Sequence, residues 1–233
     1  MQDYFDRVLV VGASRGIGAA VAQHMMPKTN KLISVSRTAA EYGDWIKADV
    51  STKAGIKAIA DAVGNSALDA LLYMGGTWET NAFTSKYSLE NCADEDIENV
   101  IAVNLLAPIR LVKSLLPALR RGKNSKIIFM GALSGLDNFP AREVANSASK
   151  FGLRGVVHSL REELRQDRIA VTIINPGNIG TPEVLNDLKQ AGQSETDAIP
   201  IADLLSVIYC VLSLSASTCI KEIQLPAMNA KGA

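Results

Sequence analysis

Apolar runs of strand length alternate along this chain with longer stretches in which apolar residues recur at helical spacing. Runs such as VLVV, KIIFM and VTII are apolar without alternation, which is typical of strands buried on both faces of a parallel sheet. The pattern predicts strands at 7–11, 31–36, 45–49, 67–74, 125–130, 170–175 and 220–225, and helices at 17–26, 52–63, 94–118, 144–166 and 201–214. Repeated strand–helix alternation favours an α/β fold with a doubly wound parallel sheet. No repeat or linker divides residues 1–233, so we expect a single domain.

Composition narrows the range of partners. The 233 residues are 48% hydrophobic and 21% charged, which suits a water-soluble globular protein. Lys plus Arg and Asp plus Glu both number 24, and without a basic run we expect no nucleic-acid or membrane partner. The apolar stretch at 204–214 is shorter than the ~20 residues of a membrane span, and the first strand follows Met1 too closely for a signal peptide.

Cysteine usage gives no sign of a disulfide framework or a metal centre. Cys92, Cys210 and Cys219 are odd in number and widely spaced, and they form no CxxC pair. We interpret them as idle thiols in a reducing compartment and expect a cytoplasmic protein without a bound metal.

A glycine-rich segment follows the first predicted strand and opens the first helix. It reads Gly12-Ala13-Ser14-Arg15-Gly16-Ile17-Gly18. Glycines permit a tight turn and close approach of the backbone to a pyrophosphate, and the helix N-terminus supplies free N–H groups. The spacing is G-x-x-x-G-x-G instead of G-x-G-x-x-G, but its place in the first βαβ unit favours a Rossmann-type dinucleotide site.

The end of the second predicted strand indicates which dinucleotide is bound. Proteins selective for NAD place an acidic residue there for the ribose hydroxyls, whereas this chain has Arg37. Together with Arg15, it would pair with a 2′-phosphate. The sequence therefore predicts NADP(H) as the cofactor.

The segment Gly12–Gly16 also matches G-x-S-x-G, the nucleophile elbow of α/β-hydrolases. That interpretation requires an oxyanion loop upstream and a histidine on a loop downstream. Only eleven residues precede Gly12, and His158 falls within a predicted helix. We therefore do not favour a hydrolase.

Five motifs in the same order resemble the short-chain dehydrogenase/reductase family over nearly the whole chain. The glycine segment resembles its cofactor loop, and Asp49-Val50 is similar to the pair that contacts adenine. Asn104 in VNLLAP resembles the asparagine that anchors the active-site water and lysine. Lys150 in SASKFGL resembles the catalytic lysine that also holds the nicotinamide ribose, and Ile179 and Thr181 lie in a PGxIxT-like loop that orients the carboxamide.

The resemblance fails at the two proton-handling positions of the family. Ala132 occupies the place of the catalytic serine, and Asn146 occupies that of the tyrosine, four residues before Lys150. YMGG replaces the usual NNAG turn, keeping Gly75 as a small cofactor-facing residue. Ser134 is interpreted as a loop hydroxyl and Ser147 as a packing residue.

The resemblance implies an NADP(H)-dependent oxidoreductase acting on a small molecule with a degenerate catalytic tetrad. Such an enzyme would suit a substrate that needs no strong acid from the protein, such as an activated double bond or an iminium. The alternative is an inactive NADP(H)-binding sensor or scaffold. The family also implies a homodimer or homotetramer through helices 94–118 and 144–166, although the apolar faces of these helices could equally belong to the core of one chain. It further implies a short substrate loop at about 182–200.

Overall fold

The strands form one parallel sheet in the computed structural model, which describes residues 4–229. The strand order is β3–β2–β1–β4–β5–β6–β7, so the direction of winding reverses between β1 and β4. Doubly wound proteins bind their ligands beyond the carboxyl ends of the strands at this switch point. The strands are β1 Phe5–Val11, β2 Thr29–Ser36, β3 Asp44–Lys47, β4 Ala70–Tyr73, β5 Lys126–Met130, β6 Ala170–Pro176 and β7 Glu222–Leu225.

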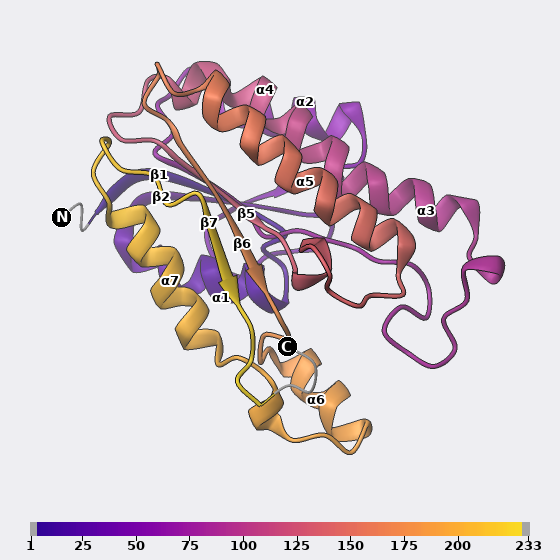
Figure 1. Ribbon diagram of the computed structural model, residues 1–233. Helices are drawn as coiled ribbons and strands as arrows, with labels where there is room; N and C mark the ends of the chain where they lie inside the picture. Colours follow the sequence, from indigo (N-terminus) through magenta and orange to yellow (C-terminus); the bar gives the residue numbers. More distant parts are fainter. Residues whose placement is uncertain (1–3, 230–233) are drawn as a thin grey trace.

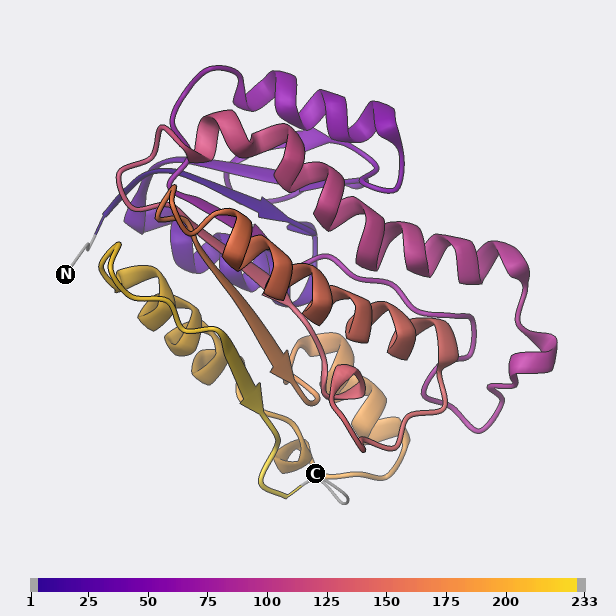
Figure 2. The same cartoon turned by 45° about the horizontal axis from the view of Figure 1, so that its top comes forward.

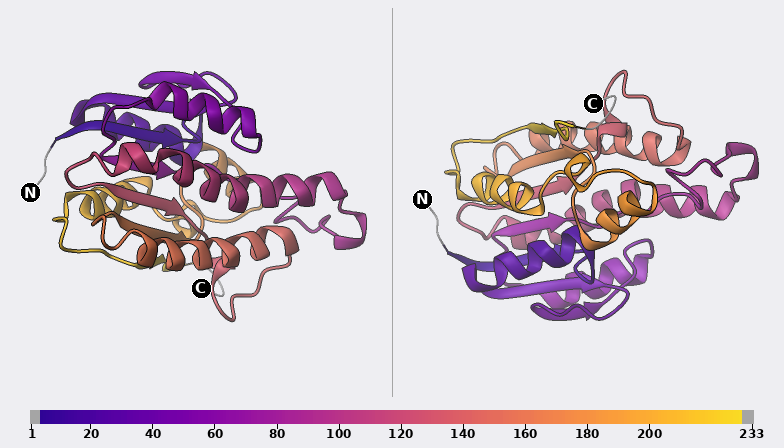
Figure 3. Two further views of the ribbon diagram at one scale, coloured as in Figure 1. Left: turned by 90° about the horizontal axis from the view of Figure 1, so that it is seen from above. Right: turned by 90° about the horizontal axis from the view of Figure 1, so that it is seen from below.

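Helices cover both faces of the sheet. In Figure 1, α2, α4 and α5 lie above the sheet while α1 and α7 lie below it, and Figure 3 shows each layer from its own side. The helices are α1 Gly16–Met25, α2 Lys53–Val63, α3 Asp94–Ile101, α4 Ala107–Leu119, α5 Val144–Glu163, α6 Pro182–Gln190 and α7 Ile201–Ser213. The architecture is therefore the expected single-domain, doubly wound Rossmann-type fold.

Two hydrophobic cores follow from the alternation of side chains along the strands. Leu9 and Val11 of β1 join the core under α2, α4 and α5, whereas Val8 and Val10 join the core over α1 and α7. All four side chains are at most 2% exposed. Both faces of β1 are buried from Val8 to Val11, which explains why this part of the strand is apolar at every position.

The predicted helix at 94–118 is interrupted in the structure. A π-helical segment, Ala102–Leu106, separates α3 from α4, although the two continue as one rod beside α5 (Figure 2). Residues Asp94–Leu119 are the one stretch within 4–229 that is long and apolar enough to cross a membrane, and the core helix of a soluble protein passes the same test. Its Val112 and Leu115 are packed into the core on the sheet.

The connection at 182–200 is more ordered than its polar composition suggested. It contains α6 and a 3-10 turn at Glu195–Asp197. The side chain of Thr181 accepts a hydrogen bond from the backbone N–H of Val184, and Pro182 starts the helix. A threonine cap followed by proline is a helix start signal, and it explains why a helix forms in this polar segment.

We predict that Gly18→Ala destabilises the protein by more than about 2 kcal/mol in urea unfolding, because overpacking at a rigid contact has this scale. A Cβ at Gly18 would lie 2.0 Å from the Gly12 carbonyl oxygen. Gly155, exposed on α5, is the matched control, since a Cβ there meets no atom within 4 Å. Gly155→Ala should stabilise the protein by about 0.5–1 kcal/mol through helix propensity. Equal effects of the two substitutions would contradict the close contact.

Candidate cofactor and active site

The turn between β1 and α1 lies at the carboxyl edge of the sheet and is held by backbone contacts. Gly12 has a φ of +84°, and a Cβ on it would lie 2.7 Å from the Cα of Gly75. The N–H groups of Gly12 and Ala13 both donate to the carbonyl of Val35, at 2.8 and 3.2 Å. Only glycine can occupy this position, because both the left-handed backbone and the space against Gly75 exclude a side chain.

The first helical turn of α1 directly follows the glycine turn. Its N-cap residue, Arg15, makes no side-chain cap, and helix geometry leaves the first N–H groups without intrahelical acceptors. Gly16 has a φ of +54°, and the atoms nearest a Cβ there belong to Thr181 and Glu183, at 4.0 and 3.9 Å. Ser14 is half-buried in the turn and Ile17 packs onto the core.

Arg37 directly follows β2, Asp49 lies two residues after β3, and Arg15 lies in the turn before α1. Arg15 and Arg37 are exposed, and neither forms an ion pair within residues 4–229. Burial alone would raise the pKa of Asp49, but hydrogen bonds from the Ser51 hydroxyl and N–H, together with the charge of Arg37, lower it. The positive charge of Arg37 is therefore one of the causes that lower the pKa of Asp49.

The remaining predicted cofactor residues lie in the segments that follow β3 and β6. Val50 packs against the core beside α2. Ile179 is 3% exposed and forms an isolated parallel bridge with Ile199, and Thr181 caps α6 next to Gly16. The structure thus brings the segment after β6 against the first turn of α1.

Lys150 lies on α5 with its ammonium group buried. Its Nζ donates to the carbonyl of Met130 at the end of β5, at 3.0 Å, and the residue is 8% exposed. Desolvation lowers the pKa of Lys150 from 10.5 to about 8. A Cβ at Gly76 would lie 3.7 Å from both the Nζ of Lys150 and the Oδ1 of Asn104, so both polar groups lie beside the loop that follows β4.

Asn146 lies one turn before Lys150 and points to the loop after β5. Its Nδ2 is 3.3 Å from the Oγ of Ser134, and both residues are buried. Ala132 begins the 3-10 turn Leu133–Gly135 and is half-buried. The hydroxyl that meets Asn146 is therefore that of Ser134, which the sequence analysis interpreted as an ordinary loop hydroxyl.

Asn104 ties three elements together from the π-helical segment. Its Oδ1 accepts from the N–H of Thr77 at 2.9 Å, and its Nδ2 donates to the Thr77 carbonyl at 2.8 Å and to the Ser149 hydroxyl at 3.0 Å. The Ser149 hydroxyl in turn donates to the carbonyl of Asn146 at 2.6 Å. The wider turn of a π-helix accommodates a residue that would not fit an α-helical ladder, and such bulges cluster at functional sites.

A polar network supports the β5 loop from the side of β6 and β7. The Nε of Arg154 contacts the Oε1 of Glu222 at 2.8 Å, and its Nη1 donates to the carbonyl of Gly135 at 3.1 Å. The Nδ2 of Asn175 donates to the same Glu222 oxygen at 2.6 Å. A Cβ at Gly131 would lie 1.9 Å from the Oδ1 of Asn175, so the backbone of the loop is packed tightly on this network.

Several residues that shape the site were not expected from the sequence. Thr77 and Glu79 carry no motif, and only the path of the chain brings them to α5, whereas Ser149 lies on α5 within SASKFGL without an assigned role. Ser147 has a buried Oγ without a hydrogen-bond partner, in agreement with a packing role. A serine two residues beyond the Ala132 position was visible in the sequence, but the geometry of the turn decided which side chain faces Asn146.

Comparison with known proteins places this geometry in context. A profile described as short chain dehydrogenase matches residues 6–191. A rhamnolipids biosynthesis 3-oxoacyl-[acyl-carrier-protein] reductase of Pseudomonas aeruginosa is 29% identical over 215 residues, covering 83% of this chain and 81% of that protein.

Two solved structures share the fold across the chain. A metagenomic short-chain oxidoreductase in complex with NADP has a TM-score of 0.77 and 26% identity, covering 97% of this chain and 98% of that one. A short chain dehydrogenase of Shigella flexneri complexed with NADP has a TM-score of 0.80 and 21% identity, covering 96% and 99%.

We predict that Lys150→Met raises the free energy of unfolding at pH 7 by roughly 1–3 kcal/mol, since each unit of pKa shift corresponds to about 1.4 kcal/mol. The folded-state pKa is lowered to about 8, so the folded protein binds fewer protons than the unfolded chain between pH 8 and the ordinary value of 10.5. The buried charge of Lys150 therefore destabilises the parent protein fully below pH 8, and this destabilisation decreases above pH 8.

Urea unfolding of both proteins at pH 7 and pH 9.5 tests this. The difference between them should shrink at the higher pH. Lys113→Met, at an exposed position on α4, is the control and should change stability by less than about 0.5 kcal/mol. A Lys150→Met protein that is less stable than the parent at pH 7 would refute a costly buried charge.

Proposed function

The chain belongs to the short-chain dehydrogenase family, and we propose that it is an NADP(H)-dependent oxidoreductase acting on a small molecule. The observation that carries this proposal is the Gly75–Gly76 dipeptide. The backbone of Gly75 packs against the glycine turn, and Gly76 lies beside the Nζ of Lys150. The two glycines therefore join a dinucleotide cradle to a buried lysine along one edge of the sheet.

The residues present fit a dinucleotide. A Cβ at Gly12 would collide with the backbone of Gly75, so the turn keeps the tight form that a pyrophosphate requires. The first turn of α1 has no side-chain cap, which leaves its N–H groups and the positive end of the helix to an anion. Ser14, Ile17 and Gly18 would complete this phosphate site.

Two exposed arginines favour the phosphorylated cofactor. Arg15 and Arg37 are both exposed, and their guanidinium groups would pair with a ribose 2′-phosphate. Asp49 and Val50 would contact the adenine. The two solved structures named above were both determined with NADP, which supports the same choice.

The residues around Lys150 would orient the reacting groups. The bound cofactor would supply the hydride. Lys150 would hold the nicotinamide ribose, while Ile179 and Thr181 would orient the carboxamide from the far side. Asn104 would keep the β4 loop in place through Thr77.

We assign Ala132 and Asn146 to the serine and tyrosine positions of the family. An amide does not titrate usefully, but Asn146 and Ser134 can both donate a hydrogen bond to a substrate oxygen. Without an acid of matched pKa, carbonyl reduction loses the ~10²–10⁴-fold gain of general acid catalysis. We therefore expect a substrate that needs no strong protein acid, such as an activated double bond, an iminium, or a compound that brings its own proton.

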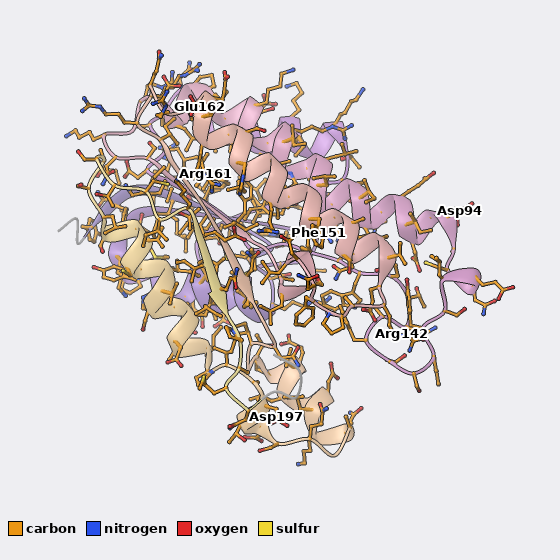
Figure 4. All side chains as sticks on the ribbon, viewed as in Figure 1. Asp94, Arg142, Phe151, Arg161, Glu162 and Asp197 are labelled. Carbon is orange, nitrogen blue, oxygen red and sulfur yellow. The ribbon has the colours of Figure 1, made fainter. Side chains whose placement is uncertain are left out.

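The surface supports a proposal for assembly. Leu106, Ile109, Val144 and Phe151, which lie on α4, on α5 or just before them, are each between 38% and 49% exposed, and Phe151 is labelled in Figure 4. An apolar face on these two helices would form a homodimer or homotetramer contact. The three cysteines are free, which suits the proposed cytoplasmic setting.

We predict that NADPH binds more tightly than NADH, and that Arg37→Asp narrows or reverses the preference. Fluorescence titration of both cofactors at low and high salt tests this, because screening should weaken NADPH binding more. Lys53→Asp, at an exposed position on α2, is the charge-matched control and should leave the ratio unchanged. Equal affinities in the parent protein would contradict the role assigned to the arginines.

We predict that restoring the missing groups restores carbonyl reduction. Ala132→Ser with Asn146→Tyr should raise kcat/KM for a small activated diketone by at least about 100-fold, in line with general acid catalysis. The charge of Lys150 should lower the pKa of the new phenol. Each single change should achieve less, because such groups act as a unit.

A further variant separates the two serine positions. If Ser134 already does the work of the family serine, Asn146→Tyr alone should match the double variant, and adding Ser134→Ala should abolish the gain. A parent that reduces the same diketone at an ordinary rate of ~10 s⁻¹ would refute the disabled tetrad. A double variant that binds NADPH but turns over no carbonyl would favour a sensor or scaffold instead.

A further inference from the structure

A carboxylate that no motif marked lies at the start of the helix that carries Asn146 and Lys150. Glu79 belongs to the loop between β4 and α3 and is only 1% exposed. Its Oε1 accepts hydrogen bonds from the backbone N–H groups of Ala145 at 2.7 Å and Asn146 at 3.2 Å. A buried ionisable side chain in a loop is costly unless it is hydrogen-bonded, so its place needs a reason.

The first turn of α5 has no cap of its own. The N-cap residue, Glu143, makes no cap, and its Oε1 instead accepts from the N–H of Phe83 at 2.9 Å. The N–H of Val144 donates to the hydroxyl oxygen of Tyr87 at 3.0 Å, and that hydroxyl lies 3.5 Å from the Oε1 of Glu79. The β4–α3 loop therefore supplies the acceptors that a local cap would otherwise provide.

Electrostatics favours this arrangement. The N-terminus of a helix stabilises negative charge, and the effect is larger in a buried site. Burial raises the pKa of the Tyr87 hydroxyl, the hydrogen bond from Val144 lowers it, and the nearby charges of Glu79 and Glu143 raise it further. The Oε1 of Glu79 thus accepts from two N–H groups of the first turn of α5, while its Oε2 is buried without a hydrogen-bond partner among residues 4–229.

The same loop has attachments that do not involve α5. The N–H of Thr80 donates to the Oδ2 of Asp96 on α3 at 3.0 Å. Arg142, at the right of Figure 4 just before α5, donates through Nη2 to the carbonyl of Tyr87 at 3.1 Å. The Asp96 contact provides a matched comparison, because it holds the loop next to Glu79 without touching the first turn of α5.

We propose that Glu79 is a positioning residue for the site. It fixes the backbone of Asn146, so that the Nδ2 of Asn146 meets Ser134 and Lys150, one turn later, stays at the Met130 carbonyl. The Ser149 hydroxyl holds the carbonyl of Asn146 at the same time. The functional consequence rests on the proposed function, because it assumes that Lys150 binds the nicotinamide ribose.

The test uses Glu79→Ala, Glu79→Gln and the control Asp96→Ala in the full chain. Amide hydrogen exchange is measured at Ala145 and Asn146, and NADPH affinity is measured by titration. In Glu79→Ala, exchange at both amides should accelerate at least 10-fold and the NADPH Kd should rise about 3- to 10-fold. Glu79→Gln, which keeps an acceptor oxygen, should recover most of both effects, and Asp96→Ala should change neither.

Chemical rescue separates positioning from general stability. Formate should restore slow exchange and NADPH affinity in Glu79→Ala, whereas chloride at the same ionic strength should not. Rapid exchange that formate does not slow would overturn the proposal, as would equal effects in Glu79→Ala and Asp96→Ala. If Glu79→Ala does not fold, Tyr87→Phe replaces it and should accelerate exchange at Val144; unchanged exchange would count against the clamp.

The two readouts keep the proposals apart. A parent protein that does not bind NADPH contradicts the proposed function, while the exchange data still decide whether Glu79 holds the first turn. A parent that binds NADPH, with exchange unaffected in every Glu79 variant, contradicts the positioning role alone.

Discussion

The site depends on the fixed position of the first two turns of α5 against the loop that follows β4. The backbone N–H of Asn146 donates to Glu79 of that loop, and its side-chain amide donates to Ser134 in the loop after β5. Its carbonyl accepts from Ser149, which lies on α5 itself. Each partner is buried, so no water replaces a bond that is lost, and a buried polar group without a partner costs about 1–3 kcal/mol. The bonds to Glu79 and Ser134 therefore fix α5 against two loops, and the bond from Ser149 holds the backbone within the helix.

Lys150 explains why such strict positioning is needed. An ammonium group in a buried site is unfavourable, and its hydrogen bond to the Met130 carbonyl offsets only part of that cost. The position is maintained because α5 is anchored on both sides of it. Glu79 and Tyr87 hold the start of the helix, and Arg154, one turn after Lys150, reaches the carbonyl of Gly135. The protein thus holds a buried ammonium group at the edge of the sheet by anchoring its helix through hydrogen bonds on both sides of Lys150.

The regular part of the fold could be predicted because its signals are local. Strand segments that are buried on both faces are apolar without alternation, as Val8–Val11 in β1 and Ile127–Met130 in β5 are. Their alternation with amphipathic helices indicates a doubly wound sheet. Two elements were not predicted, for different reasons. The π-helical interruption at Ala102–Leu106 depends on the distant contacts of Asn104, whereas the start of α6 at Thr181 is a local signal that the polar composition of the segment obscured.

By itself the sequence determined the glycine turn, the place of Lys150 on a helix and the arginines expected to face the cofactor, since spacing and residue type suffice for these. Only the tertiary structure decided that Ser134 faces Asn146, that Asn104 joins Thr77 to Ser149, and that Glu79 closes the start of α5. The physical reason is that these contacts join segments far apart in sequence. A hydrogen bond between such segments leaves no periodic pattern in either one, because it is fixed by the path of the chain across the sheet edge.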